Sequence, residues 1–381
     1  MPTKMDAVKA RLGSLKGLWE MFSGPRDVIA VDVGSYAVKV VLLKPEGAVL
    51  HLKAWAHLPI GAKADASPDE RKTAIVNALR GFMIEKGVGV REAATSLSGN
   101  AVIVRYVKFP RLTKTELQAT LATEAEPFIP FDINEVQLGF HILSELVEDG
   151  QKKMETVLVA AKKELVTARL EILHGAGLNP AIIDVDSFAL ENVNEKIRNP
   201  KEGNAATLFL NIGHMVTNLS IVENGLTRVV RDVFISGATM TKAVAKAFQC
   251  EPAKADELKK QYGVIVDAAE KEKALADGNR EALGVSQAIG QVARDLVGEV
   301  HRSVDFYLSQ GPDRAIGRIV LSGGSSRAKN LDKHLSGELK VPVSVLDPFS
   351  FVTGAAAVPE DVRPAFGVAM GLALRRNRDW E

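Results

Sequence analysis

The sequence has very little cysteine and no long apolar run. Its one cysteine, Cys250, cannot form a disulfide within the chain and fits a reducing compartment. No stretch reaches the ~18 consecutive apolar residues that a membrane-spanning helix needs. Residues 1–24 also lack the apolar centre of a signal peptide. These absences argue against a disulfide scaffold and an integral membrane protein, and we expect the protein in the cytoplasm.

An excess of charge of one sign is absent too. Forty-eight basic and 47 acidic residues give a formal net charge of +1, so no overall field attracts nucleic acid. The seven histidines are scattered, which argues against a zinc site. With 381 residues, of which 46% are hydrophobic, the chain has the composition of a globular protein and is long enough for two domains.

Residues 1–24 form a separate segment in which apolar residues recur at helical spacing. The apolar positions are Val8, Leu12, Leu15, Trp19 and Phe22, and the basic ones are Lys4, Lys9, Arg11 and Lys16. One interpretation is a helix lying on an anionic membrane, and the other is an extension that packs on its own domain or is disordered. We favour the second because Gly13 and Gly17 weaken a helix.

A short pattern occurs twice and organises the rest of the chain. Val31–Ser35 reads VDVGS and Leu210–His214 reads LNIGH, each within an apolar, β-branched run. Each copy is followed by a further strand pattern and a tight turn, and the second turn contains Asn224-Gly225. A duplicated strand–glycine turn–strand unit predicts two related lobes whose turns converge on one ligand. We expect that ligand to be the phosphates of a nucleotide.

The first copy carries groups that suit a phosphate and a metal ion. Asp32 offers a carboxylate for Mg²⁺, through water, and the turn at Gly34 and Ser35 exposes backbone N–H groups. Lys39 follows on the outgoing strand, where its ammonium can face the phosphates. Alone, this pattern is equally well explained as a capped hairpin. The second copy at Asn211 and Gly213 favours the nucleotide interpretation.

Two other features complete a possible nucleotide site. Ser322–Ser326 reads SGGSS between an apolar strand and a helix, where glycines allow close backbone approach to a ligand. Glu257 and Lys260 lie three residues apart on a helix and are placed to clamp a ribose and adenine. The alternative for that pair is a solvated charge pair, which is common on helices.

Between the two repeats lies a stretch of different texture. Capping boxes at Ser67/Glu70 and Thr113/Glu116 predict two helices. From about 92 to 161 the order of expected elements is strand, helix, strand, strand, which indicates a small α+β insertion. We expect an N-terminal extension (1–24), a first lobe (25–91 and 162–204), the insertion (92–161) and a second lobe (205–381) with a helical part at about 250–300.

In this order, the motifs resemble the actin/Hsp70/hexokinase nucleotide-binding superfamily, over essentially all of the chain after Val28. The resemblance implies an α/β fold of the duplicated, ribonuclease-H-like kind with two lobes, and it implies ATP and Mg²⁺ as cofactors, with Asp32 near the metal. It assigns nucleotide contacts to Asp32, Gly34, Ser35, Tyr36, Lys39, Asn211, Gly213, Met215, Thr217, Gly237, Glu257, Lys260, Gly323, Gly324, Ser325 and Arg327.

Within that superfamily the chain is most similar to the PilM family of type IV pilus assembly proteins, relatives of FtsA. The insertion carries the most specific stretches, VIVRYVKFP at 102–110, TKTEL at 113–117 and EAEPFIPF at 124–131. The resemblance implies a cytoplasmic protein, peripheral to the inner membrane, that binds the cytoplasmic N-terminal tail of an inner-membrane PilN-like protein through the insertion. Other pilus assembly proteins are further expected partners.

One departure from the superfamily concerns catalysis. Asn211 stands where actin-like ATPases commonly have an aspartate, and an amide brings no charge to the metal. No general base stands out, because Asp184, Asp186 and Glu191 are equally well explained as strand-end or helix-cap residues. We therefore expect nucleotide binding with slow or no hydrolysis, and no catalytic residue is assigned.

Two other functions are compatible with the superfamily resemblance. A sugar-kinase-type phosphotransferase needs a carboxylate base and a polar sugar pocket, and the sequence shows no such signature. A filament-forming, FtsA-like ATPase would carry an amphipathic membrane-binding C-terminus, whereas this chain ends in the short, charged run 374–381. The scaffold interpretation is the one we favour.

Overall fold

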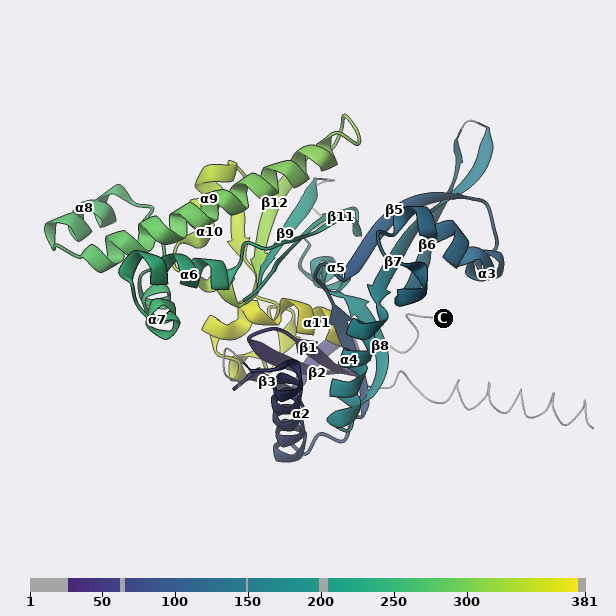
Figure 1. Cartoon of the computed structure of the whole chain (residues 1–381), viewed down its shortest axis with the longest axis horizontal. Coiled ribbons are helices and arrows are strands. Elements are labelled where there is room, and N and C mark those ends of the chain that lie inside the picture. Colours follow the sequence, from purple (N-terminus) through teal and green to yellow (C-terminus); the bar gives the residue numbers. More distant parts are fainter. Residues whose placement is uncertain (1–26, 62–65, 149, 199–204, 376–381) are drawn as a thin grey trace, which may run out of the picture.

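The computed structural model describes residues 27–61, 66–148, 150–198 and 205–375 (Figure 1). The predicted N-terminal extension and the charged residues 376–381 lie outside the described residues. Within the described part, the strands form three separate sheets: one mainly from the first half of the chain, one from the second half, and one from the segment between β4 (Glu92–Leu97) and β8 (Asn179–Val185) of the first sheet. No helix in this part of the chain is both long and apolar enough to cross a membrane.

The first sheet has six strands in the order β14-β3-β2-β1-β4-β8. These are β1 (Ile29–Val33), β2 (Ala37–Glu46), β3 (Val49–Pro59), β4 (Glu92–Leu97), β8 (Asn179–Val185) and β14 (Val352–Thr353). Strands β1 to β3 are antiparallel neighbours, whereas β4 runs parallel to β1 and to β8. Helices α2 (Pro68–Glu85) and α4 (Lys163–Gly175) pack on one face through an apolar cluster.

The second sheet has five strands in the order β11-β10-β9-β12-β13. These are β9 (Ala206–Ile212), β10 (Thr217–Glu223), β11 (Leu226–Val233), β12 (Ile316–Ser322) and β13 (Val343–Val345). Its outer face is covered by α6 (Gly237–Phe248), α7 (Pro252–Tyr262), α9 (Arg280–Leu308) and α10 (Leu331–Leu339). Helix α8 (Ala268–Ala276) lies beyond them at the far left of Figure 1.

Two helices form a layer between these sheets, α5 (Asp186–Ile197) and α11 (Gly367–Ala373). They share one apolar cluster with Ala30 and Val41 of the first sheet and with Phe209 and Val320 of the second. The helices cross very closely at Gly371, where a Cβ atom would collide with a backbone carbonyl of α5. This joint therefore connects the two lobes through tightly packed backbone.

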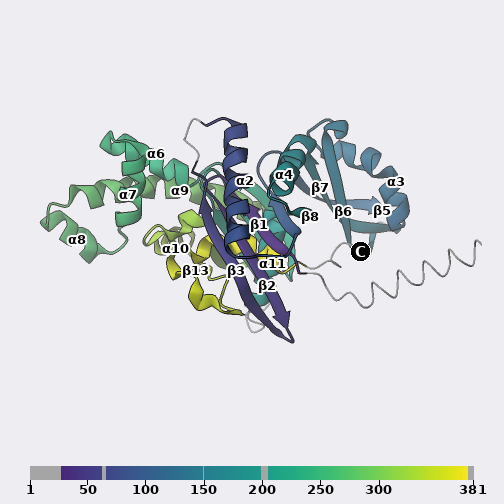
Figure 2. The ribbon, with the colours of Figure 1, turned by 90° about the horizontal axis from the view of Figure 1, so that it is seen from below.

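The third sheet, of order β5-β7-β6, stands apart from the other two (Figures 1 and 2). It contains β5 (Val102–Pro110), β6 (Val136–Glu148) and β7 (Gln151–Lys162), with α3 (Lys114–Ala125) on one face. The predicted insertion begins at Glu92, but β4 pairs with β1 and β8 in the first sheet. Strand β4 is buried along nearly its whole length, as expected of a parallel strand covered on both faces.

The two helix starts that the capping boxes predicted are confirmed. Ser67 and Glu70 form the predicted capping box of α2, and Thr113 and Glu116 that of α3. The SGGSS motif leads first into a short 3₁₀ turn, Gly324–Arg327, and α10 starts only afterwards. Among the described residues, further short 3₁₀ helices are Glu126–Phe128, Ile133–Glu135, Ala355–Ala357 and Glu360–Phe366.

Candidate functional site

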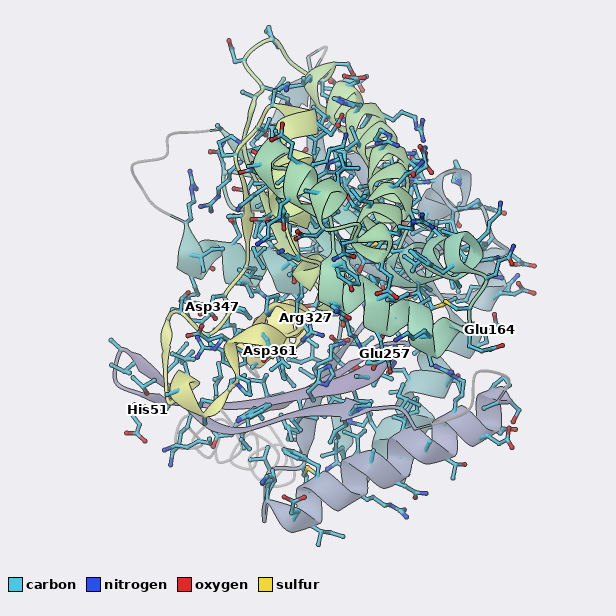
Figure 3. All side chains as sticks on the ribbon, turned by 90° about the vertical axis from the view of Figure 1, so that its left-hand side faces the viewer. His51, Glu164, Glu257, Arg327, Asp347 and Asp361 are labelled. Atoms are coloured by element: carbon cyan, nitrogen blue, oxygen red, sulfur yellow. The ribbon has the colours of Figure 1, made fainter. Side chains whose placement is uncertain are left out.

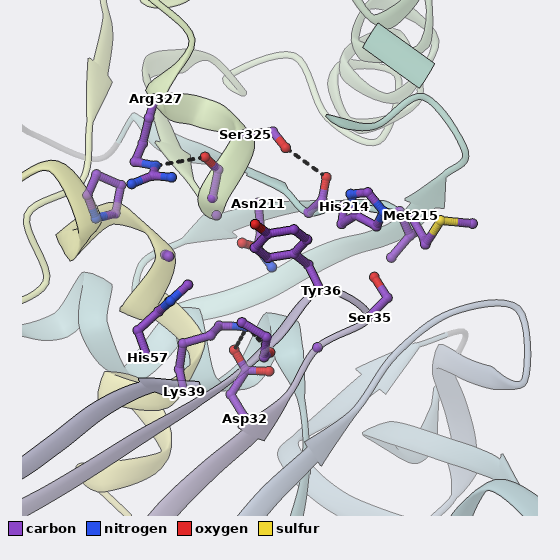
Figure 4. Close-up of a pocket in the computed structure, with 18 of the residues that line it drawn as sticks. Asp32, Ser35, Tyr36, Lys39, His57, Asn211, His214, Met215, Ser325 and Arg327 are labelled. Atoms are coloured by element: carbon purple, nitrogen blue, oxygen red, sulfur yellow. Dashed lines mark hydrogen bonds and ion pairs between the residues drawn. The ribbon is translucent and has the colours of Figure 1, made fainter. Parts of the chain in front are cut away.

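The two glycine turns face each other across one cavity of about 730 Å³ (Figure 4). They are built alike. The amide of Gly34 donates to the carbonyl of Ala37 at 3.2 Å, and the amide of Gly213 donates to that of Val216 at 3.0 Å. The aromatic rings of Tyr36 and His214, one from each turn, have centroids 5.5 Å apart. The turns therefore converge as the duplicated pattern predicts.

Glycine is required where the loops of the second lobe pack on one another. A Cβ atom on Gly213 would lie 2.6 Å from the carbonyl oxygen of Val216. Gly323 has φ +86° and would place a Cβ 2.5 Å from the carbonyl oxygen of Ile212. Ser325 donates its hydroxyl to the Gly213 carbonyl at 3.1 Å, and the Gly237 amide donates to the same carbonyl at 2.9 Å. Side chains here would separate the loops from the turn.

In the first lobe, three polar residues lie side by side on three neighbouring strands: Asp32 on β1, Lys39 on β2 and His57 on β3. We call them the first-lobe row. They lie opposite one another in the strand registers. The Lys39 ammonium is 2.7 Å from the Asp32 carboxylate, and both side chains are largely buried. All three line the cavity, and burial lowers the pKa of His57. The first-lobe row therefore contributes an ion pair to the lining of the cavity.

The second lobe places a row of different chemistry at the equivalent positions. The second-lobe row consists of Asn211 on β9, Asn218 on β10 and Asp232 on β11, again in register. The Asn211 amide donates to the Asn218 oxygen at 2.9 Å, and the Asn218 amide donates to Asp232 at 2.6 Å. Asn211 and Asn218 line the cavity. The side of the cavity formed by this row is therefore amide rather than ionic.

A carboxylate and an arginine lie beside the first-lobe row. Asp186, at the start of α5, accepts a hydrogen bond from the Ser96 hydroxyl at 2.5 Å. Loss of water contact, followed by the negative charge of Asp32, raises the pKa of Asp186 to about 6. Arg169 of α4 lines the same cavity, and burial lowers its pKa. The cavity therefore holds two carboxyl groups, those of Asp32 and Asp186, with the cations of Lys39 and Arg169 beside them.

Charged residues also line the side of the cavity formed by α7. Asp256 lies between two ammonium groups, with Lys259 and Lys260 each at 2.6 Å. Lys259 also donates to the Thr241 hydroxyl at 2.7 Å. Arg327 and Asp361, labelled beside each other in Figure 3, both line the cavity, with a guanidinium-to-carboxylate distance of 3.6 Å. These groups suit the hydroxyls of a sugar and the flat face of a base.

Most of the predicted site residues are brought to this cavity. The lining includes Asp32, Gly34, Ser35, Tyr36, Lys39, Asn211, Gly213, Met215, Lys260, Gly323, Gly324, Ser325 and Arg327. Three others are not part of the lining. Thr217 is buried and donates to the Ile235 carbonyl, Gly237 packs behind the Gly213 turn, and Glu257 pairs with Lys254.

Other lining residues were not predicted for this site. They include His57, Ser96, Ser98, Arg169, Asp186, His214, Asp256 and Lys259. Asp256 and Lys259 each lie one residue before a predicted contact, so the sequence located the helix and Lys260 but not the other two residues of the helix that line the cavity. Arg169 carried no motif, because only the packing of α4 against the first sheet brings it to the cavity.

Asp184 and Glu191, which the sequence left open as acid–base candidates beside Asp186, have structural partners. Asp184 pairs with Arg375 at 2.7 Å, and Glu191 accepts from the amide and hydroxyl of Thr227, each at 2.5 Å. Neither lines the cavity, whereas Asp186 does.

The sequence also matches a known family model over nearly its whole described length. The model of the type IV pilus assembly protein PilM matches residues 30–377. The chain belongs to the PilM family. This confirms the resemblance that the insertion and the repeated turns indicated.

Solved structures agree with this assignment. The chain is similar to a structure described as the PilM-PilN type IV pilus biogenesis complex, with 28% identity and a TM-score of 0.77. That match covers 92% of this chain and 99% of the other. The ethanolamine utilization protein EutJ from Carboxydothermus hydrogenoformans shares 14% identity with a TM-score of 0.52, covering 92% of this chain and 90% of the other. The predicted actin-like α/β fold is confirmed.

Proposed function

We propose that this PilM-family protein is a nucleotide-binding scaffold of type IV pilus assembly or of a related secretion machine. The observation that carries the proposal is the convergence of two glycine turns and the SGGSS loop on one cavity. Backbone amides in such turns bind phosphate oxygens. Because the amides of Gly34 and Gly213 donate within their own turns, the amides of the residues that follow them would serve as these donors. Asp256 with its two lysines and Arg327 would contact the ribose and the base. Together these groups favour ATP over a free sugar.

Mg²⁺ is part of this proposal. Asp32, Asp186 and the side-chain oxygen of Asn211 are the oxygen donors that would hold the ion, in part through water. Bound there, the ion supplies positive charge for the phosphates and relieves the repulsion between the two carboxylates. Asn211 contributes no negative charge, so we expect turnover far below the roughly 1–100 per second of dedicated kinases.

A thermal shift assay tests nucleotide binding. MgATP at saturating concentration should raise the melting temperature, because a ligand that binds only the folded state stabilises it. Gly213→Trp, which fills the turn, is the matched variant and should lose the shift. No shift in the unmodified chain, together with no nucleotide in the purified protein, would contradict the proposal.

We further propose that the insertion binds the cytoplasmic N-terminal segment of a PilN-like inner-membrane protein, which holds this protein at the cytoplasmic face of that membrane. A structure to which the chain is similar over nearly its full length is that of a PilM-PilN complex. Within the described residues, β5 and β6 are each paired on one side only, so they offer main-chain groups to an extended peptide. Phe128 is 40% exposed beside this sheet and offers an apolar contact.

Deletion of the third sheet tests this assignment. Replacing residues 101–161 by a short Gly-Ser linker removes β5 to β7 but keeps β4 in the first sheet. The truncated protein should retain the MgATP shift and lose recruitment to membranes that carry the partner. Normal recruitment of a truncated protein that still binds MgATP would place the partner site elsewhere.

A further inference from the structure

A chain of side-chain hydrogen bonds runs from the nucleotide cavity to the start of the insertion. It begins at Asn211, passes through Asn218 and reaches Asp232 along the second-lobe row. The second oxygen of Asp232 accepts from the backbone amide of Gly99 at 2.6 Å. Gly99 lies between β4 of the first sheet and β5 of the insertion, with φ +94°. The chain thus joins the second lobe to the connection into the insertion.

The carboxylate fixes the direction of every bond in this chain. An ionised carboxylate only accepts, so Asn218 must turn its NH₂ group toward Asp232 and its oxygen toward Asn211. Asn211 must then present its own NH₂ group to Asn218. Its side-chain oxygen remains for the cavity, where it lies close to Gly323. An aspartate at 211 would place a carboxylate against the Asn218 oxygen, which gives a physical reason for the amide.

The same face of β11 makes two further contacts with the insertion. Arg228 lies 3.1 Å from Glu155 of β7, and Val230 packs with Val104 and Val157. Together with Asp232, these alternate residues of one strand hold the insertion against the second lobe. Asp232 alone among them continues by hydrogen bonds to the cavity.

We infer that Asn218 and Asp232 are positioning residues that couple occupancy of the nucleotide cavity to the seating of the insertion on β11. The inference rests on the proposed nucleotide function. A ligand group or metal-bound water that donates to the Asn211 oxygen polarises this amide and strengthens the bonds that follow it. The ligand then favours the seated insertion over the released one. By linkage, a partner that binds the seated insertion raises nucleotide affinity by the same factor.

Hydrogen exchange of the full-length protein measures this coupling without the partner. The probe is Mg²⁺ with a non-hydrolysable ATP analogue, and the readout is exchange in a proteolytic fragment covering residues 98–110. We expect the analogue to slow exchange there by at least about fivefold, the lower end of typical coupling factors. The comparison is between bound and free states of each variant, so a merely structural loss of stability does not imitate it.

Two variants break the chain and restore it. Asp232→Asn keeps the volume but removes the carboxylate that fixes the direction of the chain. All three amides can then turn over, so that Asn211 presents its NH₂ group rather than its oxygen to the cavity, and the ligand-dependent protection should disappear. Adding Asn218→Asp moves the carboxylate one strand inward. It can then accept from Asn211 and from the new amide at position 232, whose oxygen accepts from Gly99. The double variant should recover the protection.

Arg228→Gln is the matched control, because it removes the other polar contact between β11 and the insertion and leaves the chain intact. It should raise exchange in both states while the protection by the analogue stays. An analogue that binds, shown by the thermal shift, without slowing exchange at 98–110 overturns the coupling alone. Equal loss of protection in Asp232→Asn and Arg228→Gln, or no recovery in the double variant, also overturns it. Absence of any thermal shift overturns the nucleotide proposal and the coupling with it.

Discussion

The two lobes present the same backbone design with different side-chain chemistry. Asp32, Lys39 and His57 occupy the positions across the first three strands of one sheet that Asn211, Asn218 and Asp232 occupy in the other. The first-lobe row forms an ion pair at the cavity, whereas the second-lobe row passes hydrogen bonds away from it, toward Gly99. Strand register determines which residues are neighbours. Residue type determines whether they can bind the ligand or can couple its binding to the insertion.

The largest effect should come from breaking the ion pair of the first lobe. Lys39→Met leaves Asp32 largely buried without a cation, which should cost on the order of 3 kcal/mol of unfolding free energy. Converting both residues to amides, Asp32→Asn with Lys39→Gln, imitates the second lobe and should recover at least half of that loss. Denaturant unfolding measures both. A loss below about 0.5 kcal/mol in the single variant would show that the pair is worth no more than an exposed one.

Asp186, beside the first-lobe row, should also make the stability of the protein depend on pH. Because the folded-state pKa of Asp186 is raised from 3.8 to about 6, its contribution to stability is complete below pH ~4 and is lost as pH rises through 6. Asp186→Asn should therefore stabilise the ligand-free protein by on the order of 2 kcal/mol at pH 7.5 and by almost nothing at pH 4. Melting curves of both proteins across this range give the difference, and a pH-independent difference would contradict the assignment.

The glycine turns offer a direct comparison of equivalent positions. Gly213→Ala sets a Cβ against a backbone carbonyl at 2.6 Å, whereas Gly34→Ala meets the movable Lys39 ammonium at 2.8 Å and a carbonyl at 3.0 Å. Overpacking of this kind costs about 1–3 kcal/mol, and we expect Gly213→Ala to cost about 1 kcal/mol more than Gly34→Ala. Unfolding free energies decide the order. The reverse order would show that the first turn is the more rigid one.

The smallest effect on stability is expected at Asn211, the second-lobe residue equivalent to Asp32. From the sequence, Asn211→Asp restores a charge near the metal and should alter the magnesium dependence of nucleotide binding. From the structure we also expect the ligand-free variant to lose about 1 kcal/mol of unfolding free energy, because the new carboxylate faces the Asn218 oxygen. Thermal shifts with ATP at varied Mg²⁺ should therefore be larger than in the unmodified chain, from a lower starting temperature. An unchanged starting temperature would contradict the orientation assigned to Asn218.

Sequence patterns located much of the fold because they reflect local physics. Capping boxes at Ser67 and Thr113 marked helix starts, since the side chain satisfies the free amides of the first turn wherever the helix packs. They did less well where partners are distant. Strand β4 was assigned to the insertion because it is adjacent to β5 in the chain, although its hydrogen bonds go to β1 and β8.

The sequence by itself determined the duplicated turns, the residues Asp32, Gly34, Asn211 and Gly213, and membership of the family. These follow from backbone requirements of tight turns and from short motifs, which are properties of consecutive residues. Only the tertiary structure decided that Asp186 and Arg169 join the cavity and that Asp232 reaches Gly99. Such contacts connect residues that are 74 to 133 positions apart, and they depend on how α4, α5 and β11 pack rather than on any local preference of the chain.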